Sequence, residues 1–473
     1  MTPGPDPHRP IAHLTPRTGW LNDPHGLLRW RGQYHLFFQH NPHAATWGPP
    51  VWAHVTSPNL LHWQHQPHAL TPDMPPEDDG GCWSGSVTLI DGRPYAFYTG
   101  VQQGLQTLCR ADPIDDALVR WRKDPRNPVL TNPDGVHPTR GDLRDPWVWR
   151  MSDGTYRMLQ GTSLDGHGNA LVYASPDGNA WTYLHPLMNG EAARRVHPHA
   201  GMWEMPVLVP AGDAWLLMIG AWIDGTLAQA VSALGRFEDD RFTPERVAPL
   251  DHAHACVYAP HPLVGEDRTV WMAWMQDPRP ETQRRAAGWA GALTLPRESW
   301  VEHGALRHRF APEVNALRGP ERNVTLTPTF APKPVILEGA ALRTRHAWLR
   351  ATLARGRAER IRLTLHADEA GEGGSAIDVD FGAREVRLAY AKQDGETRPH
   401  DVAPHPGMTD EVTLDAILDG GALELIIDER VTLTSWLPET RAAHAHVLAH
   451  ADGDGAQVTL RVAPLMRTIP EPA

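Results

Sequence analysis

The sequence predicts an all-β protein in which a five-bladed β-propeller is followed by a C-terminal β-sandwich. Three observations support this fold class. A polar turn followed by an aromatic strand recurs five times between residues 20 and 300. The 45 proline and 41 glycine residues among 473 supply frequent turns between short apolar runs. Beyond residue 330 the strands lengthen and their apolar residues alternate, which is typical of a β-sandwich.

The N-terminal repeat has a period of about sixty residues. Its aromatic strands begin at residues 32, 92, 154, 213 and 268. A shorter strand precedes each of them, and these preceding strands are expected at Gly26–Trp30, Ser86–Ile90, Trp147–Arg150, Val207–Pro210 and His261–Val264. A fixed period of this size, built from short antiparallel strands, is the signature of a β-propeller, so five copies predict five blades.

The C-terminal part is predicted to form the sandwich. Its strands are expected at Trp348–Leu353, Arg360–His366, Ala376–Phe381, Glu385–Tyr390, Glu411–Leu418, Ala422–Ile427, Val431–Trp436 and Gln457–Val462. Residues 301–330 contain proline, arginine and glutamate with little periodicity, so we expect a linker there. The expected domains are therefore a five-bladed propeller over residues 1–300, a linker over 301–330 and a sandwich over 331–473.

Charge argues against two classes of partner. Lysine and arginine number 44 against 56 aspartate and glutamate residues, which gives a formal net charge of −12. A nucleic acid or an anionic membrane would need a basic surface on the protein, so neither is an expected partner. No run of 18 apolar residues is present to span a membrane.

Two further features bear on the cellular compartment. The N-terminal residues contain no apolar stretch of the kind that a signal peptide needs, and the chain has only three cysteines. Both features predict a cytoplasmic protein. A mature secreted form whose signal had been removed would have the same features, so this alternative stays open. The sequence gives no indication of the oligomeric state.

The repeat places three carboxylates in comparable positions. Counting back eleven residues from the first aromatic residue of the second strand leads to Asp23, Asp145 and Glu204 in three of the five repeats. The innermost strands of a propeller line its axis, so these side chains should converge in one funnel. Asp23 and Asp145 each precede a proline, which favours an extended conformation at the residue before it. An ionised carboxylate beside a protonated one is the arrangement that glycoside hydrolysis uses.

Around these carboxylates the sequence resembles glycoside hydrolase family 32, which contains the invertases and fructan hydrolases. Trp20–Gly26 is similar to the family's W-M-N-D-P-N-G box, Gly141–Pro146 carries its R-D-P box, and Trp203–Pro206 is similar to its W-E-C-P box. Further similar segments are Phe38–Pro42, Trp47–Gly48, Trp83–Ser86, Leu293–Glu298, Leu423–Asp428 and Val431–Ser435. The ordered set covers nearly the whole chain, and the resemblance also implies a propeller followed by a sandwich.

The resemblance implies roles for individual residues. Asp23 corresponds to the nucleophile, Glu204 to the general acid/base, and Asp145 to the stabiliser of the transition state. The residues that match the lining of the fructose pocket are Asn22, Gln39, Trp47, Trp83, Ser84 and Arg144. The implied activity is release of terminal β-D-fructofuranosyl units from sucrose, fructo-oligosaccharides or fructans with retained configuration. Nucleophile and acid should then lie about 5–5.5 Å apart.

Two positions depart from the family's boxes. Met205 replaces the cysteine that follows the catalytic glutamate, and a thioether has no proton to donate to a hydrogen bond. His25 replaces the second asparagine of the first box, and a histidine there is expected to titrate near neutrality. Neither change removes a reacting group, so both bear on the pH optimum and not on whether the protein is active.

Other functions remain open at this point. A fructosyltransferase would share every residue above, because it differs only in whether water or a sugar attacks the intermediate. A catalytically inactive propeller that binds fructans is a second alternative. The preferred substrate among sucrose, inulin, levan and short oligosaccharides is not predicted. No cofactor is expected, and the pairs His252/His254 and His444/His446 lack the further ligands that a metal site needs.

Overall fold

We describe the protein from a computed structural model that places residues 6–72, 80–130, 142–253, 256–329, 335–336, 345–367, 374–391, 397–437 and 446–468. The chain forms two compact units. The larger unit comprises Thr15–Leu250 and Val257–Leu306. The smaller unit comprises Met1–Leu14, Asp251–Cys256 and Arg307–Ala473. In the described part of the chain, no helix is both long and apolar enough to cross a lipid bilayer.

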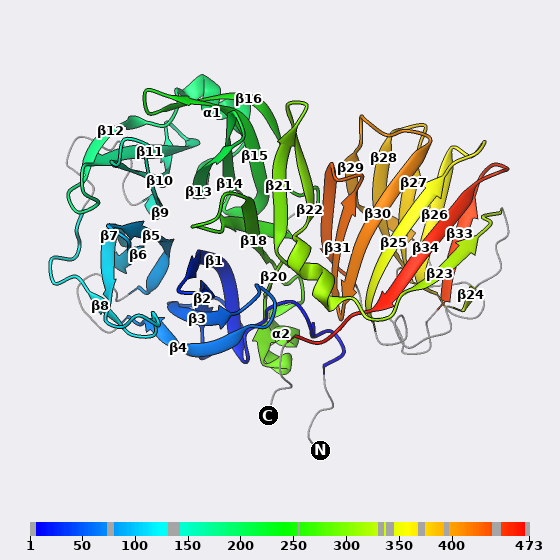
Figure 1. The fold of residues 1–473 in the computed structure, drawn as a ribbon, viewed down its shortest axis with the longest axis horizontal. Coiled ribbons are helices and arrows are strands. Elements are labelled where there is room, and N and C mark those ends of the chain that lie inside the picture. The colour runs from blue at the N-terminus through cyan, green and yellow to red at the C-terminus, as the bar shows by residue number, and fades with distance from the viewer. Residues whose placement is uncertain are drawn as a thin grey trace, which may run out of the picture. The chain divides into compact units, whose positions relative to one another are not determined.

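The larger unit is the predicted five-bladed propeller, and each blade is one antiparallel sheet (Figure 1). The first blade contains β1 (Gly19–Trp30), β2 (Gln33–Asn41), β3 (Val51–Ser57) and β4 (Gln64–Leu70). The second contains β5 (Cys82–Ile90), β6 (Arg93–Gln102), β7 (Leu105–Pro113) and β8 (Trp121–Lys123). The third contains β9 (Leu143–Arg150), β10 (Tyr156–Leu164), β11 (His167–Ser175) and β12 (Thr182–Pro186).

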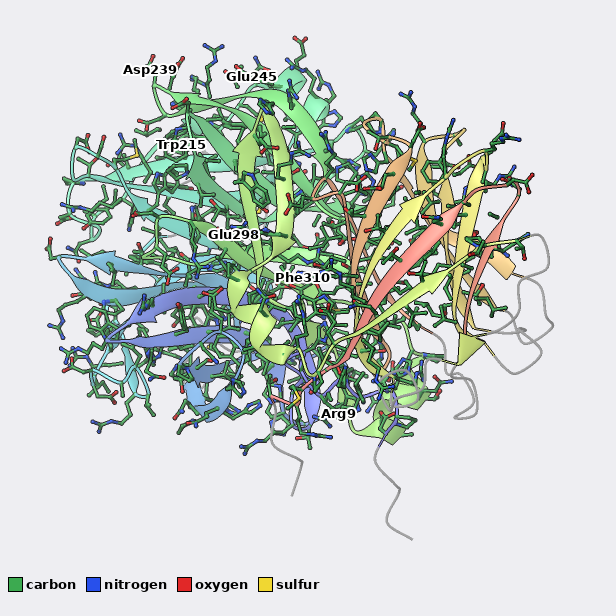
Figure 2. All side chains as sticks on the ribbon, turned by 45° about the vertical axis from the view of Figure 1, so that its right-hand side comes forward. Arg9, Trp215, Asp239, Glu245, Glu298 and Phe310 are labelled. Atoms are coloured by element: carbon green, nitrogen blue, oxygen red, sulfur yellow. The ribbon has the colours of Figure 1, made fainter. Side chains whose placement is uncertain are left out.

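The last two blades complete the ring. The fourth contains β13 (Met202–Ala211), β14 (Ala214–Ile223), β15 (Thr226–Glu238) and β16 (Arg241–Pro249), and the short helix α1 (Gly190–Val196) precedes it. The fifth contains β17 (Val257–Pro262), β18 (Thr269–Met275), β20 (Ala292–Leu293), β21 (Arg297–Glu302) and β22 (Ala305–Phe310), with α2 (Glu281–Ala287) as an insertion. Figure 2 shows exposed Asp239 at the tip of the hairpin that joins β15 to β16.

The innermost strands close the ring by contacting one another in cyclic order. These contacts run from β1 to β5, β9, β13 and β17, and β17 in turn contacts β1. The first and last blades are also joined by backbone pairing. The short strand β19 (Trp289–Ala290), which follows α2, pairs in parallel with the start of β1. Because every innermost strand faces the common axis, residues at equivalent heights in different blades come close together.

The smaller unit is the predicted sandwich, built from two six-stranded sheets. One sheet has the order β23 (Arg322–Leu326), β34 (Gln457–Pro464), β25 (His346–Ala354), β30 (Glu411–Asp419), β31 (Ala422–Ile427) and β32 (Val431–Trp436). The other has the order β24 (Val335–Ile336), β33 (His446–Ala451), β26 (Arg360–Ala367), β27 (Ser375–Asp380), β28 (Glu385–Ala391) and β29 (Thr397–Pro404). Buried and exposed residues alternate at the start of β30, as expected for a strand with one face in the core.

The boundaries of the two units differ from the expected domains in three places. The expected linker 301–330 instead holds β22, the 3-10 helix η1 (Pro312–Leu317) and β23, which pairs with β34. The N-terminal segment belongs to the sandwich unit, because the backbone amides of Ile11, Ala12 and His13 donate to the buried carboxylate of Asp419. The segment Asp251–Cys256 also belongs to that unit although it lies between two blades in the sequence.

Candidate active site

A one-residue bulge interrupts each innermost strand near the point where the strand begins. In β9, Arg144 pairs with Gly161 and Trp147 with Leu159, so Asp145 and Pro146 together oppose a single residue. The bulges of β13 and β17 fall at Met205–Pro206 and Ala259–Pro260 and have the same two-to-one pattern. A proline as second bulge residue leaves no backbone donor without a partner.

The first bulge residue in these three blades adopts a left-handed conformation. The φ angles are 58° at Asp145, 48° at Met205 and 50° at Ala259. Residues other than glycine rarely adopt such φ values, and each costs on the order of 1 kcal/mol or more. The same uncommon conformation in three consecutive blades indicates that the backbone is shaped to position side chains.

The bulges correct one step of the sequence argument. Register places Glu204 opposite Gly220, whereas Asp145 lies in the bulge, so the equivalent of Asp145 in the fourth blade is Met205. The equivalent of Glu204 in the third blade is Arg144. Counting eleven residues back from the aromatic residue therefore reaches positions that differ by one between the two blades. The reason is the turn between the first two strands: five residues separate Arg150 from Tyr156 in the third blade, whereas four separate Pro210 from Trp215 in the fourth.

Arg144, Glu204 and Tyr258 each lie immediately before the bulge of their strand, so these three side chains are at the same height in adjacent blades. Arg144 on β9 donates from Nε and Nη2 to Oε1 of Glu204 on β13, at 3.1 and 2.7 Å. Tyr258 on β17 donates its hydroxyl proton to the other carboxylate oxygen, Oε2, at 2.8 Å. Glu204 is therefore held from both sides by neighbouring blades. The tyrosine ring packs against Gly220, where an added Cβ would lie only 2.6 Å from the ring.

Asp23 is held by the second blade and by its own hairpin partner. Ser84 donates its hydroxyl proton to Oδ2 of Asp23 at 2.9 Å, and the Gln39 amide reaches the same oxygen at 3.4 Å. Gln39 also donates to the Ser84 hydroxyl oxygen. Beside Asp23, the Asn22 side chain accepts a hydrogen bond from the Trp20 indole at 2.9 Å.

Asp145 lies between the second and fourth blades. Its Oδ2 accepts the backbone proton of Met205 at 3.0 Å, and its own backbone amide donates to Thr99 at 2.9 Å. Met205 therefore acts on the site through its backbone, while its side chain is buried. Arg144 is oriented by two further acceptors, the Asp142 carboxylate at 3.0 Å and the Gln106 amide oxygen at 3.3 Å.

The three acids influence one another, which shows that they share one site. Burial raises the pKa of Asp23 to about 6, and the charge of Glu204 contributes to the increase. Burial also raises the pKa of Asp145, while Arg144 opposes and Glu204 and Asp23 support that shift. Burial of the Tyr258 hydroxyl, assisted by the Glu204 charge, raises its pKa well above the usual value. The charges of Asp23, Asp145 and Glu204 thus act on one another across three blades, as their predicted convergence requires.

Two tryptophans extend this chain of contacts outward. The Arg144 guanidinium lies 5.9 Å from the centre of the Trp83 ring, and Trp47 packs edge-on to Trp83 at 5.9 Å. Trp47 is 54% exposed, whereas Trp83 is partly buried. All six residues expected to line a pocket thus lie on the innermost strands, on β2 or in the loop that follows β2: Asn22, Gln39, Trp47, Trp83, Ser84 and Arg144.

His25 does not titrate near neutrality as expected. The side chain is fully buried against Trp52, at 4.0 Å between ring centres. Burial lowers its pKa well below the usual value, and His261 adds to this effect. Both the buried position and the neighbouring imidazole disfavour the charge, so His25 is neutral at neutral pH.

The sequence reasoning missed Tyr258, Gln106 and Thr99. No box in the resemblance contains them, and a phenol, an amide and a hydroxyl carry no signal of their own in a sequence. Tyr258 was recognisable only from strand register, because it precedes an Ala-Pro bulge as Arg144 and Glu204 precede theirs. Among the described residues, no group of three or more His, Cys, Asp or Glu is placed to hold a metal ion. His254 and His444 lie outside the described residues.

Comparison of the sequence and the structure with known proteins places the chain in a family of glycosyl hydrolases. The family model described as "Glycosyl hydrolases family 32 N-terminal domain" matches residues 13–309. Raffinose invertase of Escherichia coli is 30% identical over 481 residues, covering 94% of this chain and 92% of that protein. The cell wall β-fructofuranosidase of Pisum sativum is 32% identical over 326 residues, and this match spans 62% of the chain and only 57% of the pea protein. The crystal structure of fructan 1-exohydrolase IIa from Cichorium intybus matches over 98% of both chains with a TM-score of 0.84 at 23% identity.

Proposed function

Because the chain belongs to glycosyl hydrolases family 32, we propose that it is a retaining glycoside hydrolase that releases terminal β-D-fructofuranosyl units from sucrose or fructans. The observation that carries this proposal is the pairing of two differently held carboxylates around one axis. Hydroxyl and amide donors hold Asp23, whereas a guanidinium and a phenol hold Glu204. The names of the relatives, an invertase and a fructan exohydrolase among them, support a fructosyl substrate.

In the first chemical step, the Asp23 carboxylate attacks the anomeric C2 of the terminal fructosyl unit. The bond from C2 to the leaving oxygen breaks, and Glu204 donates its proton to that oxygen. Ser84 and Gln39 keep Asp23 oriented through Oδ2 while it attacks. The product is an ester between Asp23 and C2 of fructose, with the configuration at C2 inverted once.

In the second step, a water molecule gives a proton to Glu204 and attacks C2 on the face from which the first leaving group departed. The ester bond breaks and Asp23 regains its carboxylate, so the two inversions together give retention. Asp145 accepts hydrogen bonds from hydroxyls of the fructose ring as positive charge grows on that ring. A negative site favours this transition state over the neutral substrate.

The pocket residues complete the proposal. Asn22, Gln39 and Ser84 bind ring hydroxyls, while the indoles of Trp47 and Trp83 contact apolar faces of the sugar. Arg144 keeps Glu204 in place through its two donors. The partner is thus a small or polymeric fructoside. A cytoplasmic location stays a prediction, which fractionation of the producing cell would test.

The test is a substrate panel of sucrose, inulin, levan and short fructo-oligosaccharides, with released fructose and transferred fructose measured separately. We expect free fructose from at least one of these, initially as the β-anomer. Transfer products in excess of free fructose at high sucrose would favour a fructosyltransferase. Binding of fructans without turnover would favour the inactive binding protein.

A further inference from the structure

Thr99, on β6 of the second blade, joins two blades of the propeller through one hydroxyl group. Its side chain is fully buried. The hydroxyl oxygen accepts the backbone proton of Asp145 on β9 at 2.9 Å. The same hydroxyl donates its own proton to the backbone carbonyl of Ser84 on β5 at 3.3 Å. Because that proton is directed to Ser84, a lone pair of the oxygen remains to face Asp145.

The backbone amide of Asp145 lies in a bulge and therefore needs a partner outside its own sheet. In the register of β9 with β10, Asp145 and Pro146 together oppose a single residue. A bulge leaves its extra residue without a ladder partner, and Pro146 has no backbone proton to offer. The φ angle of Asp145 is 58°, a conformation that residues other than glycine rarely adopt. The bond to Thr99 thus holds a backbone conformation that local preference alone would not keep.

The position of Thr99 in its strand faces the next blade. Thr99 pairs with the residue that precedes the bulge of its blade, and the third and fourth blades have Gly161 and Gly220 at this position. A Cβ added to Gly161 would lie 2.2 Å from a backbone oxygen of the fourth blade, and one added to Gly220 would lie 2.6 Å from an aromatic ring of the fifth. A side chain at this position is thus directed at the innermost strand of the following blade. In the second blade there is room for one, and the Thr99 side chain reaches Asp145 there.

The contacts of Thr99 extend to both carboxylates that its neighbours hold. On one side, the carboxylate of Asp145 accepts the backbone proton of Met205 at 3.0 Å, so the second blade fixes the backbone of Asp145 and the fourth fixes its side chain. On the other side, the Ser84 hydroxyl donates to Oδ2 of Asp23 at 2.9 Å. A continuous path therefore links the Asp23 carboxylate, both polar groups of Ser84, the Thr99 hydroxyl and the backbone of Asp145.

We propose that Thr99 is a positioning residue for Asp145: its hydroxyl holds the left-handed backbone of Asp145 against Ser84, the residue that holds Asp23. This inference rests on the proposed function, because it takes Asp145 as the stabiliser of the transition state that forms when Asp23 attacks. Thr99 acts through these two residues and does not touch the substrate itself.

The test compares Thr99→Val, which keeps the shape of the side chain but removes the hydroxyl, with Thr99→Ser, which keeps the hydroxyl. Thr99→Val should lower kcat for sucrose about 10- to 100-fold, since misplacing a group by about 1 Å costs up to about 10²-fold. KM should change little, because the lost interaction is one that forms in the transition state. Thr99→Ser should retain most of the wild-type kcat.

A double-mutant cycle with Asp145→Gly shows whether Thr99 acts through Asp145. Glycine adopts a left-handed φ without steric cost, and this change removes the carboxylate. Turnover of these slow variants is measured with an aryl fructoside, whose leaving group needs little protonation. In the Asp145→Gly background, Thr99→Val should cause no further loss, because no carboxylate remains to be positioned. A full further loss in that background would overturn the proposal.

The matched control is Thr107→Val, because Thr107 is a buried threonine of the same blade whose hydroxyl donates to the Gly100 carbonyl at 3.2 Å, within that blade. Thr107→Val should leave kcat unchanged even if it lowers the melting temperature. An equal fall of kcat in this control would contradict the proposal, and so would a Thr99→Ser variant as slow as Thr99→Val. Should Thr99→Val fail to fold, Thr99→Cys enters the same cycle, since a thiol is a weak donor and acceptor. A wild-type protein without activity on any β-fructoside would instead refute the proposed function.

Discussion

Arg144 directs two of its donors to a single oxygen of Glu204, Oε1, and leaves the other oxygen to Tyr258. This division has a chemical consequence. Oε1 already accepts two hydrogen bonds from the guanidinium, so in the proposed mechanism the proton that Glu204 donates is expected on Oε2. The Tyr258 hydroxyl must then turn from donor to acceptor, which a phenol is able to do.

Tyr258→Phe therefore tests the role of this hydroxyl. We expect kcat for sucrose to fall about 10- to 100-fold, because a hydrogen bond to a charged group contributes about 1.5–3 kcal/mol. The Glu204 carboxylate loses the donor that holds Oε2, so it is positioned by Arg144 alone. Tyr173→Phe is the control, because the buried Tyr173 hydroxyl has no hydrogen-bond partner among the described residues and Tyr173 lies on β11, outside the innermost strand of the third blade. A kcat equal to that of the wild type would remove Tyr258 from the mechanism.

Azide rescue separates the acid/base from the stabiliser. Glu204→Gln should slow sucrose cleavage on the order of 10³-fold, but cleavage of an aryl fructoside much less, because a good leaving group needs little protonation. Deglycosylation then lacks its base, and added azide should restore turnover and yield a fructosyl azide of retained configuration. Asp145→Asn should slow every substrate alike without rescue. If azide rescued Asp145→Asn but not Glu204→Gln, Asp145 would be the acid/base and Glu204 the stabiliser, contrary to the proposal.

The pKa of Asp23 predicts how activity and stability depend on pH. A nucleophile with a pKa of about 6 is protonated below that pH, so the acidic limb of kcat/KM should lie near pH 6. The folded value exceeds the ordinary value of 3.8, so stability falls as pH rises from about 4 to about 6. Asp23→Asn should therefore increase the free energy of unfolding at pH 7 by up to about 3 kcal/mol, and the melting temperature should rise accordingly. At pH 3.5 the variant and the wild type should melt alike, and a difference that persists there would contradict this origin.

The buried His13 predicts that the sandwich also loses stability with rising pH, but in a higher pH range than Asp23. Its Nδ1 and Nε2 lie 2.8 Å from carboxylate oxygens of Asp419 and Glu424, and all three side chains are fully buried. Burial lowers its pKa, but the two carboxylates outweigh this and raise it to about 9. The stabilisation, about 3 kcal/mol from the shift, is complete below pH 6.5 and is lost as pH rises through 9. His13→Gln should remove that dependence in thermal melts from pH 6 to 10. A variant that retains the wild-type slope would place the titrating group elsewhere.

Much of the fold was predictable because it repeats. Turn and aromatic strand recur with one period, so the five blades followed from the sequence. The strand β29 was missed because Pro399 and Pro404 argue against a strand, and the structure accommodates them by placing β29 at the edge of its sheet. Segment 251–256 was unpredictable for a different reason, since its partner Thr434 lies 183 positions away in the chain.

The sequence predicted those site residues whose type alone indicates a chemical role. Carboxylates before prolines drew attention to Asp23 and Asp145, whereas Tyr258 has no such mark. Its role depends on register, and register depends on bulges and on a turn that is one residue longer in one blade. The neutral state of His25 was equally hidden, because it follows from complete burial beside a second histidine and not from the sequence around it.

The most direct test of the proposed mechanism is the identity of the residue that carries the fructosyl group. Glu204→Gln is incubated briefly with an aryl fructoside without azide, quenched in acid and digested, and the peptides are analysed by mass spectrometry. We predict one added anhydrohexose unit on the peptide that contains Asp23, located on that carboxylate by fragmentation, and its disappearance when azide is added. A fructosyl group on another residue, or full turnover to product of inverted configuration without any adduct, would contradict the account.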